Sequence, residues 1–487
     1  MERNYEAIDL NCSNAGQDFC HSDDGITRAG PKRQWCYICL IITATISAIL
    51  VPLILFVFVP AIAQGMINSA EFTFLSAEIS SPTNETFELY AAIEIGDIGP
   101  FSATAYFLGP VELCWKGGVI GSVVLPPLEI KSGGARLSLN GVVNVFDENR
   151  FAESIQEIVR SEYFEWQMKG QIQALAFGIK IDGLLLDKSI KLRGLNGLKE
   201  IVVGSFNLPS NDPVKGITLD ISASVINPSP VSMALGDVIF DVFFSQSHIG
   251  EVMVPNLQIH PGNNSLNMGG RLLPITNQND QSRLNILFSN FVAGHESQID
   301  VVGVSVNSSD PVSWLNKAIR GLQISTIFKS SGNYKFLTSL QMSKVNLEFF
   351  NHSPYSPKLS APDVVAGFST PFGDFPLSIN SIKQHVDLMT HTRIATIDSK
   401  WTKARGSSDF GRVFTGLHDE TLVVEQGKES EWDDFCSRVA HGSGKVMINM
   451  KGYADVKAEA SIGPFMIEHV AFQDEIPFEG SFVPILV

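Results

Sequence analysis

The 487-residue sequence lacks the short signatures on which several enzyme classes depend. It contains no Asp-x-Asp pair, which many glycosyltransferases use to hold a nucleotide-bound metal ion. It also contains neither the Gly-x-Ser-x-Gly turn of serine hydrolases nor the His-Glu-x-x-His pair of zinc peptidases. We therefore expect no catalytic, cofactor-binding or metal-binding residues. A lumenal glycosyltransferase is kept only as the least favoured alternative.

Basic residues are few. Lys and Arg number 35 against 51 Asp and Glu, which gives a formal net charge of -16 at pH 7. Because binding a phosphate backbone depends on clustered cations, we expect no nucleic-acid partner. The chain is 44% hydrophobic and 18% charged, a balance typical of a folded protein, and its length allows about three domains.

Cysteine is scarce where it could form a disulfide framework. Four of the six cysteines lie within the first 39 residues: Cys12, Cys20, Cys36 and Cys39. The body therefore holds only Cys114 and Cys436, and whether these two pair stays open. Cys36 and Cys39 border the apolar stretch described next, so they are candidates for S-acylation, with plain apolar packing as the alternative.

Charge is absent from one long stretch, between Arg33 and Glu71. Within it, residues 37 to 63 exceed the roughly 20 apolar residues that a helix needs to cross hydrocarbon. Pro52 and Pro60 do not oppose this, because membrane helices tolerate proline. We predict a transmembrane helix over residues 36–64.

Basic residues give this helix an orientation. Arg28, Lys32 and Arg33 precede it, whereas the next basic residue after it is Lys116. By the positive-inside rule the tail, residues 1–35, is cytosolic and the body is lumenal or extracellular. Ala61-Ile62-Ala63 resembles a signal-peptide cleavage site, but the apolar run is far longer than the ~7–15 residues of a signal core, so we favour an uncleaved anchor.

Short modification and sorting motifs fit this topology. Four Asn-x-Ser/Thr triplets follow the helix and are candidates for N-glycosylation: Asn84, Asn263, Asn307 and Asn351. A fifth, at Asn11, would be cytosolic and unused. Tyr5-Glu6-Ala7-Ile8 fits the tyrosine-plus-hydrophobe pattern of endosomal and vacuolar sorting signals, with Tyr5 and Ile8 as its key residues; an ordinary polar tail is the alternative.

The body contains internal repeats, which indicate tandem domains. Five residues, Gly121, Pro126, Leu128, Ile130 and Gly133, align without a gap on a second set at an offset of 129. That second set is Gly250, Pro255, Leu257, Ile259 and Gly262. A third copy is predicted from Asn351, Ser353 and Pro354, which repeat Asn227, Ser229 and Pro230 at an offset of 124. We predict repeats over residues 65–196, 197–325 and 326–487.

Hydrophobic periodicity gives each copy the same elements. Alternating β-branched and aromatic runs, such as residues 217–226, 237–244 and 250–259, predict antiparallel strands. Apolar residues at helical spacing predict one short helix per copy, over residues 151–159, 284–291 and 432–439, each followed by a further strand near Ile172, Ile299 or Val446. The fold class is mainly β: a transmembrane helix, then three tandem β-sandwich domains, each with a short helix.

The second copy carries a family resemblance, in Asn227-Pro228-Ser229-Pro230, Ile249-Gly250, Val254-Pro255 and Pro261-Gly262. These residues resemble the late embryogenesis abundant group 2 domain, also called the water-stress and hypersensitive-response domain. With its anchor and tandem copies, the chain is similar to a fungal family of single-span vacuolar-membrane proteins. The first copy lacks the Asn-Pro pair, and the third has His352 in place of proline.

The resemblance implies immunoglobulin-like sandwiches, a vacuolar or lysosome-like membrane, and a binding or scaffold role without catalytic residues. We expect a non-enzymatic type II membrane protein whose lumenal body binds a lipid between the sheets of one domain, or binds another membrane protein. The alternative is a structural or adhesive ectodomain at the plasma membrane. Apolar stripes alone do not decide between these functions, because any two-sheet core requires them.

Overall fold

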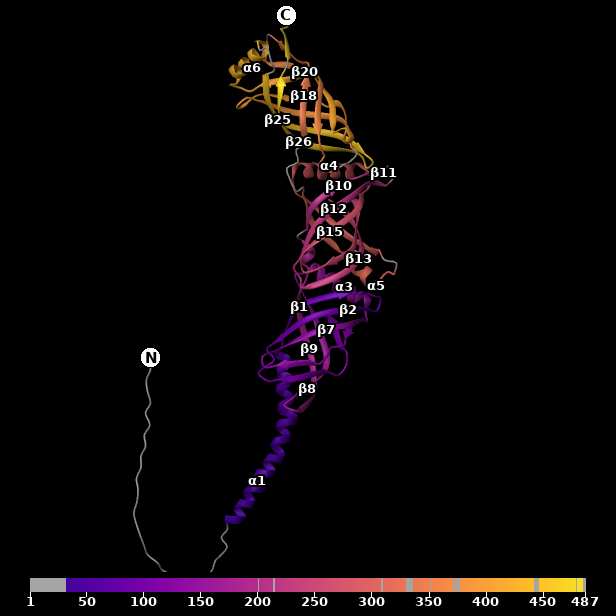
Figure 1. Cartoon of the computed structure of the whole chain (residues 1–487), viewed down its shortest axis with the longest axis vertical. Coiled ribbons are helices and arrows are strands. Elements are labelled where there is room, and N and C mark those ends of the chain that lie inside the picture. The colour runs from indigo at the N-terminus through magenta and orange to yellow at the C-terminus, as the bar shows by residue number, and fades with distance from the viewer. Residues whose placement is uncertain are drawn as a thin grey trace, which may run out of the picture. The chain divides into compact units, whose positions relative to one another are not determined.

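The computed structural model describes residues 32–199, 201–212, 215–307, 310–329, 336–350, 352–370, 372, 377–441, 446–478 and 480–484. It is mainly β-structure, with two sheets and one long apolar helix near the N-terminus, as the sequence predicts at this level (Figure 1). The chain divides into two compact units, Met1–Ala61 and Ile62–Val487. The sorting-signal candidates Tyr5 and Ile8 and the sequon at Asn351 lie outside the described residues.

The apolar helix is continuous from Tyr37 to Ser69, and none of its most hydrophobic window is buried against the protein. It consists of α1 (Lys32–Leu53), a π-helical turn (Ile54–Phe58) and α2 (Val59–Ser69). The π turn begins two residues after Pro52, which has no N–H to donate. The Val59 N–H closes the turn by donating to the Ile54 carbonyl. The predicted long apolar helix is confirmed: it is long and apolar enough to cross a membrane.

The last turns of α2 belong to the second unit and are held by polar contacts. The Gln64 side chain donates to the Leu185 carbonyl and accepts from the Leu185 N–H, both at 2.9 Å. Lys188 Nζ donates to the Asn68 carbonyl at 2.8 Å, and Ser69 Oγ to the Asp97 carbonyl at 3.0 Å. Residues 62–69 are therefore fixed on the body.

The first strand group comprises β1 to β9 with one helix, α3. Its pairing runs from β1 to β2 and β7, on through β5 and β6 to β4 and β3, and finally to β8 and β9. The bounds are β1 (Glu71–Ser80), β2 (Thr86–Gly96), β3 (Ala103–Phe107), β4 (Val111–Trp115), β5 (Gly118–Val123), β6 (Leu128–Lys131), β7 (Gly134–Val145), α3 (Glu148–Arg160), β8 (Tyr163–Ala176) and β9 (Ile179–Arg193).

The second strand group, β10 to β17, has the same order. It runs β10, β12, β15, β14, β13, β16, β17, with every neighbour antiparallel. The bounds are β10 (Ile201–Asn207), β11 (Asn211–Asp212), β12 (Gly216–Asn227), β13 (Val231–Phe244), β14 (Ser247–Ile259), β15 (Gly262–Leu272), α4 (Gln278–Ala293), β16 (Ser297–Asn307), α5 (Ser313–Ile319) and β17 (Gln323–Phe328).

The aligned glycines have the same role in both groups. A Cβ on Gly121 would lie 2.3 Å from the Asn144 carbonyl of β7, and one on Gly250 would lie 2.7 Å from the Arg271 carbonyl of β15. Both strands therefore approach their neighbour too closely for a side chain. The repeat detected between the first two copies reflects equivalent strands.

The third strand group lies in a separate sheet and corrects one sequence prediction. Its order from one edge is β26, β25, β21, β22, β24, β20, β19, β27, with β18 paired to β20 and β23 paired to β21 and β24. By this order β20 corresponds to β12 and β21 to β13, so the junction before β20 is not equivalent to the turn at Asn227. The predicted alignment of Asn351 on Asn227 is wrong by one strand, because similar turn residues recur at both junctions. The bounds are β18 (Leu337–Ser343), β19 (Val345–Phe350), β20 (Ser353–Phe368), β21 (Ser378–Met389), β22 (Arg393–Asp398), β23 (Thr402–Ser407), β24 (Arg412–Val424), α6 (Glu429–His441), β25 (Val446–Ala460), β26 (Gly463–Phe478) and β27 (Gly480–Pro484).

Three predicted helices and the strands after them are confirmed as α3, α4 and α6, followed by β8, β16 and β25. Each helix buries one apolar face, for example Phe151 and Ile155 on α3, or Trp432 and Phe435 on α6. Asn277 caps α4, since its side chain accepts from the Asp280 N–H. The boundaries of the three predicted repeats stay predictions.

The joint between the first and second groups is a packed interface. Strand β1 pairs in parallel with β13 through Ala77 and Val231. From α5, Trp314 is 2% exposed, packs edge-to-face on Phe151 at 5.0 Å, and donates from Nε1 to the Thr83 carbonyl at 2.7 Å. The Trp314 indole therefore stabilises the contact between the first and second groups.

An ion pair borders this joint. Glu148 accepts from Ser313 Oγ at 2.7 Å and from Lys317 Nζ at 2.9 Å. The Ser313 hydroxyl and then the Lys317 ammonium lower the pKa of Glu148 from its ordinary value. The stabilisation is therefore present at neutral pH and is lost as the pH falls through the lowered pKa.

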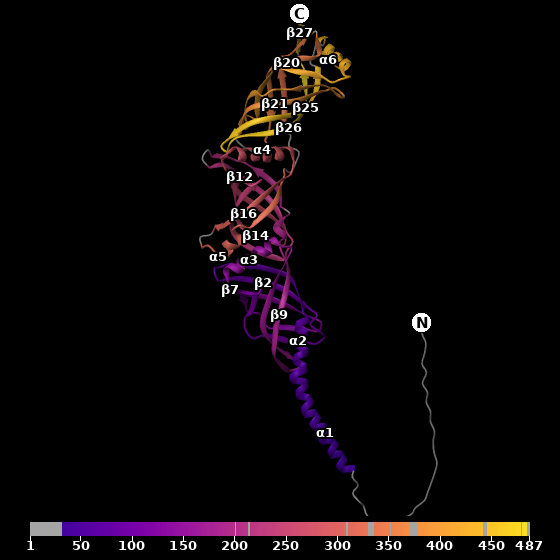
Figure 2. The same cartoon turned by 180° about the vertical axis from the view of Figure 1, so that it is seen from behind.

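The second and third groups also meet at a built interface, where α4 covers the edge strand β26 (Figures 1 and 2). Asn285 Oδ1 accepts from the Met466 N–H at 2.8 Å, and Ser289 Oγ accepts from the Glu468 N–H at 2.9 Å. Side chains of α4 thus satisfy donors that an edge strand would otherwise expose.

The Asn-Pro-Ser-Pro segment forms a buried turn between β12 and β13. Asn227 is 2% exposed; its Nδ2 donates to the Val231 carbonyl at 2.9 Å, and its Oδ1 accepts from the Ser229 N–H at 2.8 Å. Ser229 Oγ donates to the carbonyl of Arg193, at the end of β9, at 2.6 Å. The motif has a structural role, as an Asx turn that also ties the second group to the first.

Candidate ligand cavity

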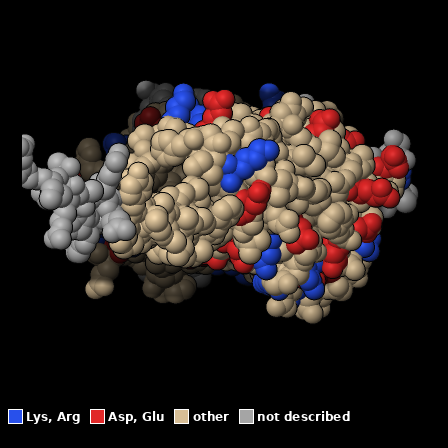
Figure 3. Space-filling view, turned by 90° about the horizontal axis from the view of Figure 1, so that it is seen from below, with Lys and Arg blue, Asp and Glu red and all other residues tan. Residues whose placement is uncertain are grey.

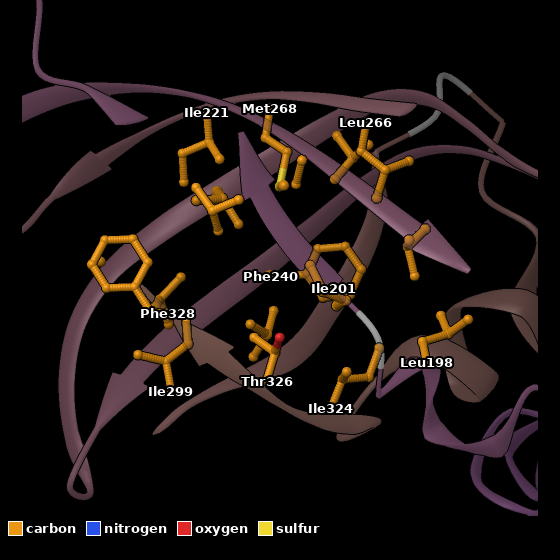
Figure 4. A pocket seen from close by; sticks show the side chains of 18 of the residues that line it. Leu198, Ile201, Ile221, Phe240, Leu266, Met268, Ile299, Ile324, Thr326 and Phe328 are labelled. Atoms are coloured by element: carbon orange, nitrogen blue, oxygen red, sulfur yellow. The ribbon is translucent and has the colours of Figure 1, made fainter. Parts of the chain in front are cut away.

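The interior of the second strand group contains a cavity of about 160 Å³ (Figure 4). Alternate residues of its strands point inward, as a pleated sheet requires. On β12 these are Leu219, Ile221 and Ala223, and on β15 they are Leu266 and Met268. The cavity lies where seven strands surround one core that their side chains do not fill.

Helices close both ends of this cavity. At one end lie Leu284, Leu287 and Phe288 of α4, together with Phe372 from the segment between β20 and β21. At the other end lie Ile155 of α3 and Ile319 of α5. Elements from all three strand groups therefore contribute to its walls.

The side of the cavity is bounded by two strand edges. Among the described residues, no hydrogen-bond ladder joins β10 to β17, although both strands line the cavity with Ile201, Val203, Ile324 and Phe328. Inward residues such as Ile201 and Val203 are only half-buried. We call this line between β10 and β17 the seam; it is the place where a ligand could enter.

The lining is hydrocarbon with one exception. Of the described residues that line the cavity, only Thr326 has a polar side chain, and none is charged. The sequence did not reveal this site, because the cavity depends on how seven strands and three helices pack. The sequence contained one local signal of this site. In β17 the inward-facing residues are Ile324, Thr326 and Phe328, so a polar residue stands on the buried face of the strand.

A smaller apolar cavity of about 70 Å³ lies in the third group. Its walls include Phe368, Ile379, Val456 and Val470, which are inward residues of the sheet, and Phe336 just before β18. The polar side chains Gln384 and Thr415 also line it. Of these two apolar spaces, the one in the second group is the larger.

One cluster could hold a divalent cation, although the sequence predicted no metal ligands. Asp241, His248 and Glu251 lie on the hairpin of β13 and β14, with ligand atoms within 4.8 Å of one another. His248 Nε2 lies 3.2 Å from Asp241 Oδ1, and the His248 ring stacks on Phe243. These side chains are partly exposed and contact one another, so we assign them no role.

The predicted modification sites lie on the surface where they are described. Asn84, Asn263 and Asn307 are exposed. Asn84 Oδ1 accepts from the Ser313 N–H at 2.7 Å, which leaves its Nδ2 unused by that bond. Cys39 is exposed on α1, whereas the Cys36 side chain lies outside the described part.

The two cysteines of the body are free thiols on separate strand groups, Cys114 on β4 and Cys436 on α6. Burial raises the pKa of Cys114, and burial raises the pKa of Cys436 to about 12. Both thiols stay protonated at neutral pH, which opposes a reactive role. The question left open by the sequence is answered: they do not pair.

Surface charge is mixed in the view of Figure 3. Lys and Arg side chains lie singly among Asp and Glu there and form no continuous basic area. These features define a class: a mainly β protein with an apolar interior cavity and a helix long enough to span a membrane.

Residues 119–242 match a family described as "Protein of unknown function (DUF3712)". The match runs from β5 into β13, about a quarter of the chain, and includes α3 and the Asn227 turn. A search of curated proteins finds no match. Among solved structures, the chain is similar to a Beta-D-Mannosidase from Dictyoglomus thermophilum at 12% identity and a TM-score of 0.12. That match covers 57% of this chain and 32% of the mannosidase, and so low a score carries no argument.

Proposed function

We propose that this chain is a membrane-anchored, non-enzymatic binding protein that takes an apolar ligand into the cavity of the second strand group. The observation that supports this is the cavity itself, with its hydrocarbon walls. An engineered cavity of about 150 Å³ with similar walls stays dry and takes up benzene. Transfer of a hydrocarbon chain or ring from water into such a space is favourable by about 0.8 kcal/mol per CH₂.

The volume limits what the ligand places inside. A space of about 160 Å³ accepts a ring or part of one chain, not a whole membrane lipid. The seam would let the remainder of a longer molecule stay outside. Binding would require no charged residue, because desolvation of apolar surface supplies the driving force.

Ala223→Phe is expected to weaken ligand binding at least tenfold. Ala223 lines the cavity and is 5% exposed, so the added ring would occupy the space of the ligand. The measurement is a titration of the full chain in lipid nanodiscs with N-phenyl-1-naphthylamine, a neutral dye that fluoresces in apolar surroundings. The signal of nanodiscs without protein is subtracted, because their bilayer also takes up the dye.

The matched control is Val202→Phe. Val202 lies on the outer face of β10 and is 63% exposed, so the same ring there should leave dye binding unchanged. Equal dye binding by wild type and Ala223→Phe, with both chains folded, would contradict the proposal.

We further propose that the strand groups are immunoglobulin-like sandwiches of the late embryogenesis abundant group 2 type, in a vacuolar or lysosome-like membrane. The shared strand order of the first two groups and the Asn227 turn support the first part. The distribution of basic residues around α1 supports a cytosolic N-terminus. A pH-sensitive fluorescent tag on each terminus in turn would test the compartment, and a surface rim would favour the adhesive ectodomain instead.

Asn263→Gln is expected to reduce the glycosidase-sensitive shift of the chain on a gel, because Asn263 is exposed on the side that would meet the glycosylation machinery. Asn11→Gln is the control and should have no effect, since that triplet would be cytosolic. A glycan at Asn11 with none at Asn84, Asn263 or Asn307 would reverse the proposed orientation.

A further inference from the structure

Thr326 places one hydroxyl group in an otherwise hydrocarbon cavity. Its side chain is 5% exposed, and its Oγ1 has no hydrogen-bond partner within the part of the chain that the structure describes. On β17 it points inward with Ile324 and Phe328 (Figure 4). Most buried polar groups have a partner, so this exception requires an explanation.

Neither packing nor water explains the hydroxyl. Valine has nearly the same shape and would fill the position without an unpaired polar atom. A buried water usually makes two to four hydrogen bonds, whereas the side chains lining this cavity supply one polar partner, from Thr326. A partner for Oγ1 would therefore come from a molecule that occupies the cavity.

We infer that the ligand is a neutral, mostly hydrocarbon molecule with one hydroxyl or carbonyl group, which forms a hydrogen bond with Thr326 Oγ1. This inference rests on the proposed function and names its ligand class. A charged group does not fit beside Thr326, because no lining side chain could pair with it and burial of an unpaired charge is very costly.

The position of Thr326 also orients the ligand. The hydroxyl lies on β17, one of the two edges of the seam. The polar group of the ligand would lie at this edge, and its hydrocarbon part would extend toward the half-buried Ile221, Leu266 and Met268 of the opposite wall. Long-chain alcohols and neutral esters have this arrangement, whereas a fatty acid ionised at neutral pH does not.

The test compares 1-decanol with decane as competitors of N-phenyl-1-naphthylamine on the full chain in nanodiscs, for wild type and Thr326→Val. We expect the preference of wild type for decanol over decane to fall about three- to tenfold in Thr326→Val, the effect of one net hydrogen bond. Both competitors also partition into the nanodisc bilayer. This partition is the same for the two proteins, so it cancels when the decanol-to-decane preference of wild type is divided by that of Thr326→Val. Decanoate at neutral pH should compete more weakly than decanol in both proteins.

A control variant and a melting temperature distinguish a failure of this inference from a failure of the proposed function. Ser325→Ala, on the outer face of the same strand, should keep the wild-type preference. The ligand-free melting temperature of Thr326→Val should be equal or higher, because an unpaired hydroxyl is removed; a clear decrease would indicate a structural role and overturn the inference. An unchanged decanol preference in Thr326→Val overturns it too, while decane still binds. Failure of every competitor and of the dye would instead overturn the proposed function.

Discussion

Trp314→Ala is expected to lower the free energy of unfolding by about 3–5 kcal/mol, the usual cost of deleting a buried aromatic side chain. Trp314 is 2% exposed, contacts Phe151 and Phe87, and satisfies the Thr83 carbonyl. Removal would leave a cavity at the joint and a carbonyl without its partner. Urea unfolding of the full chain, with amide hydrogen exchange to locate the opened segment, would measure the effect.

Trp401→Ala is the matched control for this change. Trp401 is 38% exposed, with Lys457 Nζ 4.2 Å from its ring centroid, so the loss should be about 1 kcal/mol or less. Trp314→Phe should fall between the two, because it keeps the ring contacts and loses the hydrogen bond. Faster exchange should appear in α5 and in the turn between β1 and β2. If Trp314→Ala and Trp401→Ala are equally mild, the joint does not depend on the indole.

Asn227→Ala is expected to cost about 2–4 kcal/mol, because it leaves the Ser229 N–H and the Val231 carbonyl without their side-chain partner. The loss should spread to the first group, because Ser229 holds the Arg193 carbonyl at the end of β9. Melting curves of the purified full chain would show the change.

Asn140→Ala serves as the comparison for this turn, since Asn140 is exposed on β7 and its replacement should stay within about 0.5 kcal/mol. Ser229→Ala combined with Asn227→Ala should cost less than the sum of the single changes, because both belong to one hydrogen-bond network. Strict additivity of the two changes would contradict a shared turn.

The local elements were accessible from sequence because each has a short-range signal. A charge-free run predicts the apolar helix, and helical spacing of residues such as Phe151 and Ile155 predicts α3. Helix α5 was missed, because its seven residues form barely two turns and their periodicity is too short to detect. Its burial depends on Phe87 and Phe151, far away in the chain.

The candidate site was not accessible in the same way. A cavity is the volume left after side chains from distant strands have packed, and no single segment encodes that remainder. Copy three shows the related limit: turn residues around Ser353 and Pro354 resemble those at Ser229 and Pro230, yet strand pairing assigns them to different junctions. Only Thr326 gave a signal in the sequence, because it is a polar residue at an inward-facing position of a strand.

The parallel pairing of β1 with β13 has a consequence for biosynthesis. Ala77 emerges from the ribosome more than 150 residues before its partner Val231. Until then one edge of β1 lacks the neighbour that it has in the finished sheet, and such a long-range contact forms slowly. We expect the first strand group to remain incomplete during synthesis until the second has been made. In that period β1 would be exposed to chaperones, and truncation before β13 would leave an aggregation-prone product.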